Sequence, residues 1–224
     1  MRIENPGRYI MPTPGPAGRR RFLRAAAAAL ALCVTGLSGC GSIKPVRYYQ
    51  LTHPPVTSSG SQAPLDVLIL VRLFQTSHLY REDRIVYGAE KVQLGLYEND
   101  RWTEPPVDLL QDALARGLRS SGSFRAVTTL RSEANVDYYL TGQLYAFREV
   151  SANDSIVARL NYDVELMDLK KGKVIWRHTY SHDEPSTGKT VGDVVMAMDK
   201  NVQRSVQEVQ DGILQALANY IPKK

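Results

Sequence analysis

Residues 156–166 read IVARLNYDVEL, and along this stretch apolar side chains alternate with mostly polar ones. The apolar positions are Ile156, Ala158, Leu160, Tyr162, Val164 and Leu166, and the polar positions between them are Arg159, Asn161, Asp163 and Glu165. Because successive side chains of a β-strand point to opposite faces of the sheet, a period of two places all the apolar groups on one face. The stretch therefore predicts an antiparallel strand with one buried face and one face in water.

The C-terminal part of the chain has a helical period. Apolar side chains recur every three or four positions at Val191, Val195, Met198, Val202, Val206, Val209, Ile213, Leu217 and Tyr220. This spacing matches the 3.6-residue turn of an α-helix and predicts one straight helix about 45 Å long. We expect Thr190 to cap this helix and Pro222 to stop it. A single apolar stripe of that length requires a sheet beneath it.

The other segments predict further strands and one shorter helix. The expected strands cover residues 47–51, 65–74, 84–87, 91–97, 124–130, 136–147 and 174–180. Residues 84–87 and 91–97 are expected to form a hairpin about Gly88-Ala89-Glu90, and Glu98-Asn99-Asp100 is expected to be a turn. The shorter helix should begin near Thr103 as its cap, with two prolines in its first turn, and end at Gly122.

Together these elements predict an α+β fold: a two-layer sandwich in which an antiparallel or mixed sheet carries two helices packed on one face. We expect this domain to cover residues 65–224 and to include the first strand at 47–51. Residues 40–64 would supply a short tether, that first strand and a loop. A chain of this length is long enough to bury one hydrophobic core.

The stretch Leu37-Ser38-Gly39-Cys40 has the form of a lipobox, small residues followed by a cysteine that receives a diacylglyceryl group. An uncharged run from Ala25 to Gly39 leads into it, too short to span a bilayer but typical of a signal-peptide apolar region. We therefore predict that residues 1–39 are a lipoprotein signal peptide and that the mature chain begins at lipidated Cys40. A buried Ala-rich helix with a core cysteine is the alternative interpretation.

The basic part of this leader is compatible with two export routes. Residues 18–24 read GRRRFLR, which resembles the twin-arginine export motif except that Gly18 stands where a hydroxyl residue is usual. An ordinary basic leader for the general secretory pathway explains the same residues equally well. The sequence leaves the route open.

Removal of the leader changes the charge of the chain. Residues 1–39 hold six arginines and one glutamate, which leaves 22 basic and 22 acidic residues in the mature chain. The pI of about 9.2 therefore reflects the export segment, and nucleic-acid binding is not expected. Cys33 is removed with the leader and Cys40 carries lipid, so the mature chain has no pair of thiols for a disulfide.

The residues offer no convincing catalytic, metal or cofactor site. His178 and His182 are four apart, but on a strand this spacing does not bring two ligands together as it does on a helix. Asp163 and Glu165 share the wet face of their strand, where a solvated charged surface is the simpler interpretation. We therefore expect a protein that is not an enzyme and needs no cofactor and no metal.

Five short motifs in order resemble the ABC-type transport auxiliary lipoprotein family. They are Tyr48-Tyr49-x-Leu51, Asp83-Arg84-Ile85-Val86-Tyr87, Arg101-Trp102-x-x-Pro105-Pro106, Ser123-Phe124-Arg125-Ala126-Val127 and Tyr138-Tyr139-Leu140-Thr141-Gly142. The resemblance runs from about Tyr48 to Tyr220. It implies a non-enzymatic outer-membrane lipoprotein that serves an inner-membrane ABC transporter. The implied partner is a periplasmic MCE-domain protein that carries phospholipids or similar hydrophobic molecules between membranes.

Candidate contact residues follow from position and composition. Trp102 is a candidate partner anchor, although its place beside a helix start also fits packing in the core. Tyr139 and Tyr145 lie on the strand face opposite Leu140 and Leu144, where exposed tyrosines would suit an interaction surface. We predict that the outer membrane is reached through the lipid on Cys40, and that homo-oligomer formation is possible.

The sequence predicts a location for the mature protein but leaves more than one role open. Gly41 follows Cys40 in place of an aspartate-type inner-membrane retention signal, so we expect the periplasmic face of the outer membrane. A lipoprotein chaperone or plug of an outer-membrane protein, or a structural envelope lipoprotein, are the other role classes.

Overall fold

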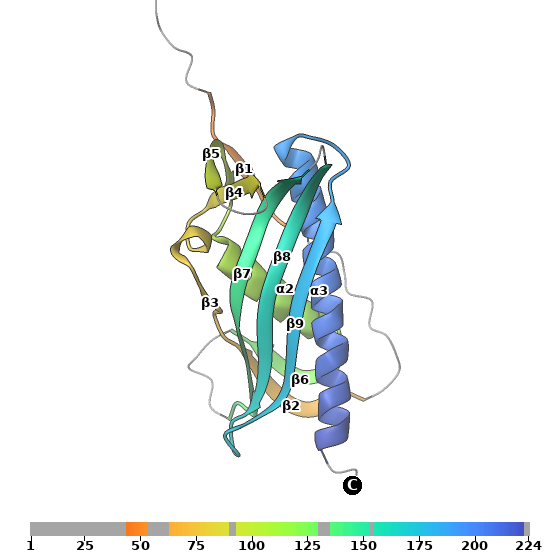
Figure 1. Cartoon of the computed structure of the whole chain (residues 1–224). Helices are drawn as coiled ribbons and strands as arrows, with labels where there is room; N and C mark the ends of the chain where they lie inside the picture. The colour runs from red at the N-terminus through yellow and green to blue at the C-terminus, as the bar shows by residue number, and fades with distance from the viewer. Residues whose placement is uncertain (1–43, 53–62, 90–92, 130–134, 153–154, 222–224) are drawn as a thin grey trace, which may run out of the picture. The chain divides into compact units, whose positions relative to one another are not determined.

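The computed structural model describes residues 44–52, 63–89, 93–129, 135–152 and 155–221 (Figure 1). In chain order the elements are β1 (Arg47–Tyr49), β2 (Leu65–Val71), β3 (Gln75–Thr76), the 3-10 helix η1 (His78–Tyr80), β4 (Arg84–Ala89), β5 (Leu94–Trp102), α2 (Pro106–Ser120), β6 (Phe124–Thr128), β7 (Tyr138–Ala152), β8 (Ser155–Asp168), β9 (Lys173–Pro185) and α3 (Val191–Tyr220).

The sheet is built around β7. One edge of β7 pairs with β8 in antiparallel register from Tyr138↔Asp168 to Ala152↔Ser155. The other edge pairs in parallel with β2, β3 and β4, one after another along its length. Beyond these, β9 pairs antiparallel with β8, β6 pairs parallel with β2, β5 pairs antiparallel with β4, and β1 pairs parallel with β5. The sheet is therefore mixed, which was one of the two predicted alternatives.

Both helices cover the same face of this sheet (Figure 1). α3 packs against β8 and β9, α2 packs against β2 and β6, and the two helices contact each other. The core lies between these two layers, where Leu114 of α2 is 0% exposed and Val202 of α3 is 3% exposed. The predicted α+β fold with two helices on one face is confirmed. Neither helix in the described part of the chain combines the length and the hydropathy needed to cross a membrane.

The long helix begins as its sequence predicts. The Thr190 side chain accepts a hydrogen bond from the Asp193 backbone N–H, and the Asp193 carboxylate accepts one from the Thr190 backbone N–H. This reciprocal pair is a capping box, which satisfies backbone donors that the first turn leaves unpaired. The helix ends at Tyr220, two residues before the proline that was expected to stop it.

The expected turn at Glu98-Asn99-Asp100 is wrong, because these residues continue β5 as far as Trp102. β1 lies alongside in parallel register, with Arg47 opposite Asp100. The Asp100 carboxylate accepts hydrogen bonds from the Arg47 guanidinium at 2.9 Å and the Tyr49 hydroxyl at 3.0 Å. These partners lie some fifty residues away in the chain, and they allow a polar segment to remain extended.

The expected cap at Thr103 is also wrong. The backbone N–H of Thr103 donates to the Tyr49 carbonyl at 2.8 Å, which keeps this residue beside β1. The helix α2 begins at Pro106, with Pro105 at the cap position and no side-chain cap. Proline has no backbone N–H, so the two prolines leave no unpaired donor of their own at the start of the helix. At the other end Gly122 has a φ of 63°, the left-handed conformation that commonly follows a helix.

A close contact between the helices depends on Gly117. A Cβ built on Gly117 of α2 would overlap Cγ1 of Val206 on α3. Val206 is 6% exposed and branched at Cβ, so it has few other rotamers available. The absence of a side chain at position 117 therefore lets the two helices approach each other.

We predict that Gly117→Ala destabilises the protein, although alanine normally favours a helix over glycine. Overpacking of this kind typically costs about 1–3 kcal/mol. The control is Gly192→Ala in α3, where the added Cβ would meet only Thr190 Oγ1 at 3.7 Å. That change should leave the free energy of unfolding unchanged or raise it by up to about 1 kcal/mol. Urea unfolding of both variants measures the difference. Equal stability of the two would contradict the close crossing.

Candidate functional site

Of the four residues singled out by the sequence, the structure describes three, and it places Trp102 apart from the two tyrosines. Cys40 lies outside the described residues. Trp102 is 2% exposed, and its ring meets the Phe147 ring edge-on, with 5.3 Å between centroids. The structure therefore places Trp102 in the core, where a partner cannot reach it. This excludes the interpretation of Trp102 as a surface anchor and agrees with the packing alternative.

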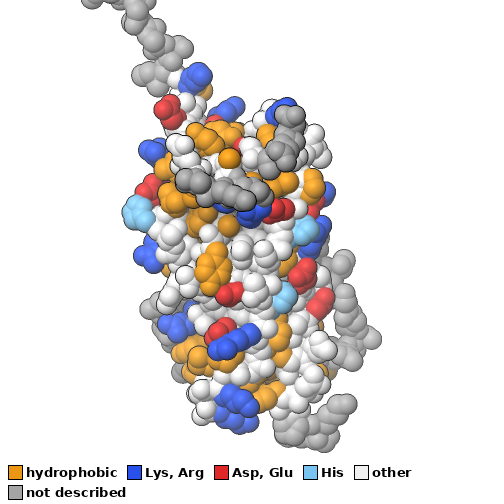
Figure 2. Space-filling view, in the orientation of Figure 1, with side chains coloured by type: hydrophobic (Ala, Val, Ile, Leu, Met, Phe, Trp, Pro, Cys, Tyr) orange, Lys and Arg blue, Asp and Glu red, His pale blue; other side chains and the backbone are white. Residues whose placement is uncertain are grey.

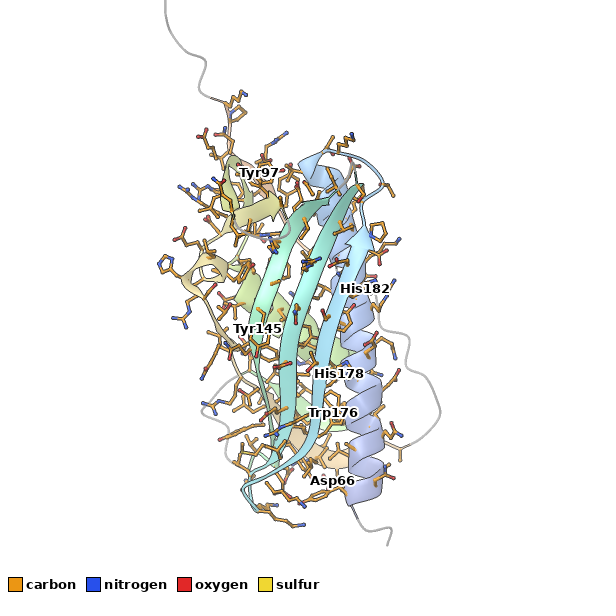
Figure 3. All side chains as sticks on the ribbon, viewed as in Figure 1. Asp66, Tyr97, Tyr145, Trp176, His178 and His182 are labelled. Atoms are coloured by element: carbon orange, nitrogen blue, oxygen red, sulfur yellow. The ribbon has the colours of Figure 1, made fainter. Side chains whose placement is uncertain are left out.

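Tyr139 and Tyr145 lie on the outer face of the sheet, the face of β7, β8 and β9 opposite the helices. Leu140 and Leu144 point to the core with 0% and 1% exposure, so the neighbouring tyrosines point outward. Tyr145 is 48% exposed and stands near the middle of the long strands (Figure 3). We call this surface the outer sheet face, and within the described residues neither helix covers it.

Tyr139 is held between a cation and a small apolar cluster. The Arg72 guanidinium lies 5.3 Å from the centre of the Tyr139 ring. The ring also packs against a second buried cluster made by Leu68, Leu70 and Val136. A cation over an aromatic face is attracted by the ring electrons, so the two side chains orient each other. Only part of the Tyr139 ring therefore remains available to a partner.

The hydroxyl of Tyr145 is fixed by a carboxylate on the neighbouring strand. It donates a hydrogen bond to Asp163 Oδ2 at 2.8 Å, and the Thr179 hydroxyl donates to Asp163 Oδ1 at 2.6 Å. These hydrogen bonds, from Thr179 and from Tyr145, hold the pKa of Asp163 below its ordinary value. The same bond to Asp163 raises the pKa of Tyr145. The tyrosine thus presents its ring in a defined orientation while its polar tip is already satisfied.

Further charges on the outer sheet face are paired across strands. Arg159 of β8 binds the Asp183 carboxylate of β9 with two hydrogen bonds, of 2.7 and 2.6 Å. Glu165 of β8 lies 2.8 Å from the Arg177 guanidinium of β9. The expectation of a solvated charged face is therefore confirmed for Asp163 and Glu165. Pairs that are already satisfied leave little charge to attract a partner from a distance.

The two histidines face α3 and lie apart from each other. His178 Nε2 is 3.4 Å from a Glu208 carboxylate oxygen, and His182 Nε2 is 3.4 Å from Glu184 and also contacts Arg204. Four residues along a strand span roughly 13 Å, too far for two ligands of one ion. Among the described residues no group of three or more His, Cys, Asp or Glu side chains is arranged to hold a metal ion.

Glu184 binds the C-terminal end of β9 to α3. Its carboxylate is 8% exposed and receives Lys200 at 3.2 Å and Arg204 at 2.9 Å. Burial by itself would raise the pKa of Glu184, but the hydrogen bond from Lys200 and the charges of Arg204 and Lys200 hold that pKa below its ordinary value. The cluster of Glu184, Lys200 and Arg204 stabilises the contact between β9 and α3, because the carboxylate of the strand faces the two cations of the helix.

Two hollows on the described part of the surface are considered for their lining residues. One, of about 460 Å³, lies where the chain leaves β2 and meets the start of α2, and its lining includes Arg72, Leu73, Arg81 and Asp108. Burial, and the nearby charges of Glu104 and Asp112, raise the pKa of Asp108. The other, of about 310 Å³, lies between β9 and the end of α3 beside Trp176 and Tyr220. The residues that line these two hollows do not place a nucleophile beside a base.

Comparison with known proteins adds to this geometry. The family model described as "ABC-type transport auxiliary lipoprotein component" matches residues 49–210. No curated protein matches the sequence. Among solved structures, protein XCC0632 from Xanthomonas campestris is similar at 20% identity with a TM-score of 0.69, over 77% of this chain and 98% of that chain. An uncharacterized protein is similar at 14% identity with a TM-score of 0.62, over 76% of this chain and 99% of that chain. At identities of 20% and 14%, the similarity to these two structures shows a shared fold and nothing about function.

The tyrosine–carboxylate pair on the outer sheet face is directly testable. We predict that Tyr145→Phe raises the pKa of Asp163 toward the ordinary value of about 3.9, because one of its two hydrogen-bond donors is lost. A lowered pKa stabilises the folded state above the pKa of the unfolded chain, and this contribution is lost as the pH falls through the folded-state pKa. The variant should therefore lose less stability on acidification than the wild type.

Carboxyl NMR titration of Asp163 measures the shift. The control is Tyr139→Phe, which removes a hydroxyl from the same face and leaves both donors to Asp163 in place. An unchanged Asp163 titration in Tyr145→Phe would show that this hydrogen bond does not form in solution.

Proposed function

Because the chain belongs to the ABC-type transport auxiliary lipoprotein component family, we propose that it is a non-enzymatic, lipid-anchored auxiliary component of an ABC transport system. We propose further that it sits on the periplasmic face of the outer membrane. There it would help to move phospholipids or similar hydrophobic molecules between membranes. The observation that carries the proposal is the match across nearly the whole folded domain, directly behind a cysteine in a lipobox.

The short tether limits where such a domain can act. Six residues lie between Cys40 and Arg47, the first residue of β1. Fully extended, they reach at most about 25 Å. A domain anchored at Cys40 therefore stays beside its own membrane. If the transported molecule passes to or from the inner membrane, another component must cross the space between, and an MCE-domain protein of the ABC system is the partner that we propose.

The outer sheet face is the surface that we propose for this partner. It carries the half-exposed Tyr145, whose hydroxyl is already bound to Asp163. Tyrosine is enriched at protein interfaces because it offers a large rigid ring at a small entropic cost. The ion pairs around it, Arg159–Asp183 and Glu165–Arg177, are already formed within the chain. With a mature net charge of zero, association should depend only mildly on salt.

The anchor and the function are tested together in a strain that lacks the gene and carries either the wild-type chain or Cys40→Ser. We predict that wild-type protein fractionates with the outer membrane as processed lipoprotein, whereas Cys40→Ser is soluble or unprocessed. Two or three acyl chains hold a protein on a bilayer far more firmly than one, so loss of the lipid should abolish the anchoring.

The envelope-permeability defect of the deletion should equal that of a strain lacking the transporter, and only the wild-type chain should restore it. Cys33→Ser is the matched control, since that cysteine is predicted to leave with the signal peptide. A deletion strain with normal permeability and normal lipid distribution, beside a transporter deletion that disturbs both, would contradict the proposed role. Processed Cys40→Ser protein in the outer membrane would contradict the anchor.

A further inference from the structure

Large apolar side chains are exposed at one end of the domain. Val46 is 44% exposed, Tyr48 63%, Tyr87 39% and Leu94 42%. They belong to β1 and the residue before it, and to β4 and β5, which lie together at the top of Figure 1. The space-filling view shows apolar side chains gathered over the same end (Figure 2). We call these four residues the apolar end.

The sheet holds this apolar end in place. The Tyr87 ring lies against the Tyr97 ring, with 4.6 Å between their centres, and the Tyr97 hydroxyl donates to Glu149 of β7 at 2.8 Å. Gly95 stands opposite Tyr87 in the β4–β5 pairing, and a Cβ there would overlap the Tyr87 ring. Tyr87 is therefore fixed by its neighbours and projects from a paired strand.

The tether joins the domain at the same end, because Val46 directly precedes β1. β1 runs parallel to β5, with Arg47 opposite Asp100, so Arg47 and Tyr48 stand beside the last residues of β5. The lipid on Cys40 can lie at most about 25 Å from Arg47. The apolar end is therefore the part of the domain that the tether brings toward the bilayer.

We infer that the apolar end rests in the interface of the membrane to which Cys40 is anchored, an inference that rests on the lipid anchor proposed above. Tyrosine is enriched at membrane–water interfaces, where its ring lies among the upper acyl chains and its hydroxyl meets the headgroups. Tyr48 and Tyr87 have this character, and Val46 and Leu94 add purely apolar surface. Side chains at such an interface lie only about 5–10 Å deep, which matches a contact made by a few exposed groups.

This contact also orients the domain. β4 pairs with residues 148–151 of β7, so the apolar end lies beside the end of β7 near Ser151. Tyr145 is six residues from Ser151 along that strand, about 20 Å away. The central part of the outer sheet face therefore stays clear of the headgroups and open to a partner in the aqueous space.

The test uses single cysteines in the mature lipoprotein. Cys33 leaves with the predicted signal and Cys40 carries the lipid, so an introduced cysteine would be the only free thiol. Tyr48→Cys, Leu94→Cys and the control Tyr145→Cys are each labelled with an environment-sensitive fluorophore. Tyr145 is a matched control because its 48% exposure lies between the 63% of Tyr48 and the 42% of Leu94. The proteins are reconstituted in vesicles of phosphatidylethanolamine and phosphatidylglycerol that contain a nitroxide-labelled lipid.

We expect lipid-borne nitroxide to quench the labels at 48 and 94 and to leave the label at 145 bright, with aqueous iodide giving the opposite order. Vesicle flotation reports the anchor separately. Protein that floats, but whose labels at 48 and 94 respond like the label at 145, would overturn the interfacial contact and leave the anchor intact. Equal lipid quenching at all three positions would mean that the domain lies flat, which also overturns the inference. Protein that fails to float would overturn the anchor and the inference together.

Discussion

The fold depends on matching the length of one helix to the length of three strands. β7 has 15 residues, β8 has 14 and β9 has 13, and one face of these strands is apolar. At about 3.3 Å per residue such strands extend close to 50 Å. A helix rises only about 1.5 Å per residue, so covering that face requires about thirty residues. α3 has 30 residues and supplies them in one element. Without it the apolar face of β8 and β9 would lie in water.

The polar groups that are buried between α3 and the sheet need hydrogen-bond partners. Asn201 of α3 is 0% exposed, and its amide donates to the backbone carbonyls of Ala158 and His182 at 2.9 and 3.0 Å. The Tyr180 hydroxyl donates to the Asn201 side-chain oxygen at 2.6 Å. A buried amide without these partners would destabilise the fold. Because the bonds join the helix to two different strands, they also fix the position of the helix along the sheet.

The elements that the sequence predicts well are those with a local signal. The alternation at residues 156–166 lies inside β8, and the stripe from Val191 to Tyr220 spans α3. The errors occur where distant residues decide the conformation. β9 continues beyond Tyr180 because Arg159 pairs with Asp183 and α3 holds Glu184, and neither partner is visible in the local sequence. For the same reason, the extension of β5 could not be predicted. The position of Trp102 beside a helix start allowed its burial to be predicted as an alternative, but not its contact with Phe147. The outward direction of Tyr139 and Tyr145 could be predicted, because it follows from the alternation on β7.

The central claim is that a short tether and an apolar end hold the domain at its membrane, while the outer sheet face meets the transport system. In vivo photo-crosslinking tests it directly, with a photoreactive amino acid at Tyr145 and, as control, at Gln207 on the exposed side of α3. The account predicts an adduct with the MCE-domain protein from position 145, identified by mass spectrometry. It also predicts none from position 207, and none from either position when Cys40→Ser removes the anchor. Equal adducts from both positions, or an adduct from position 207 alone, would contradict it.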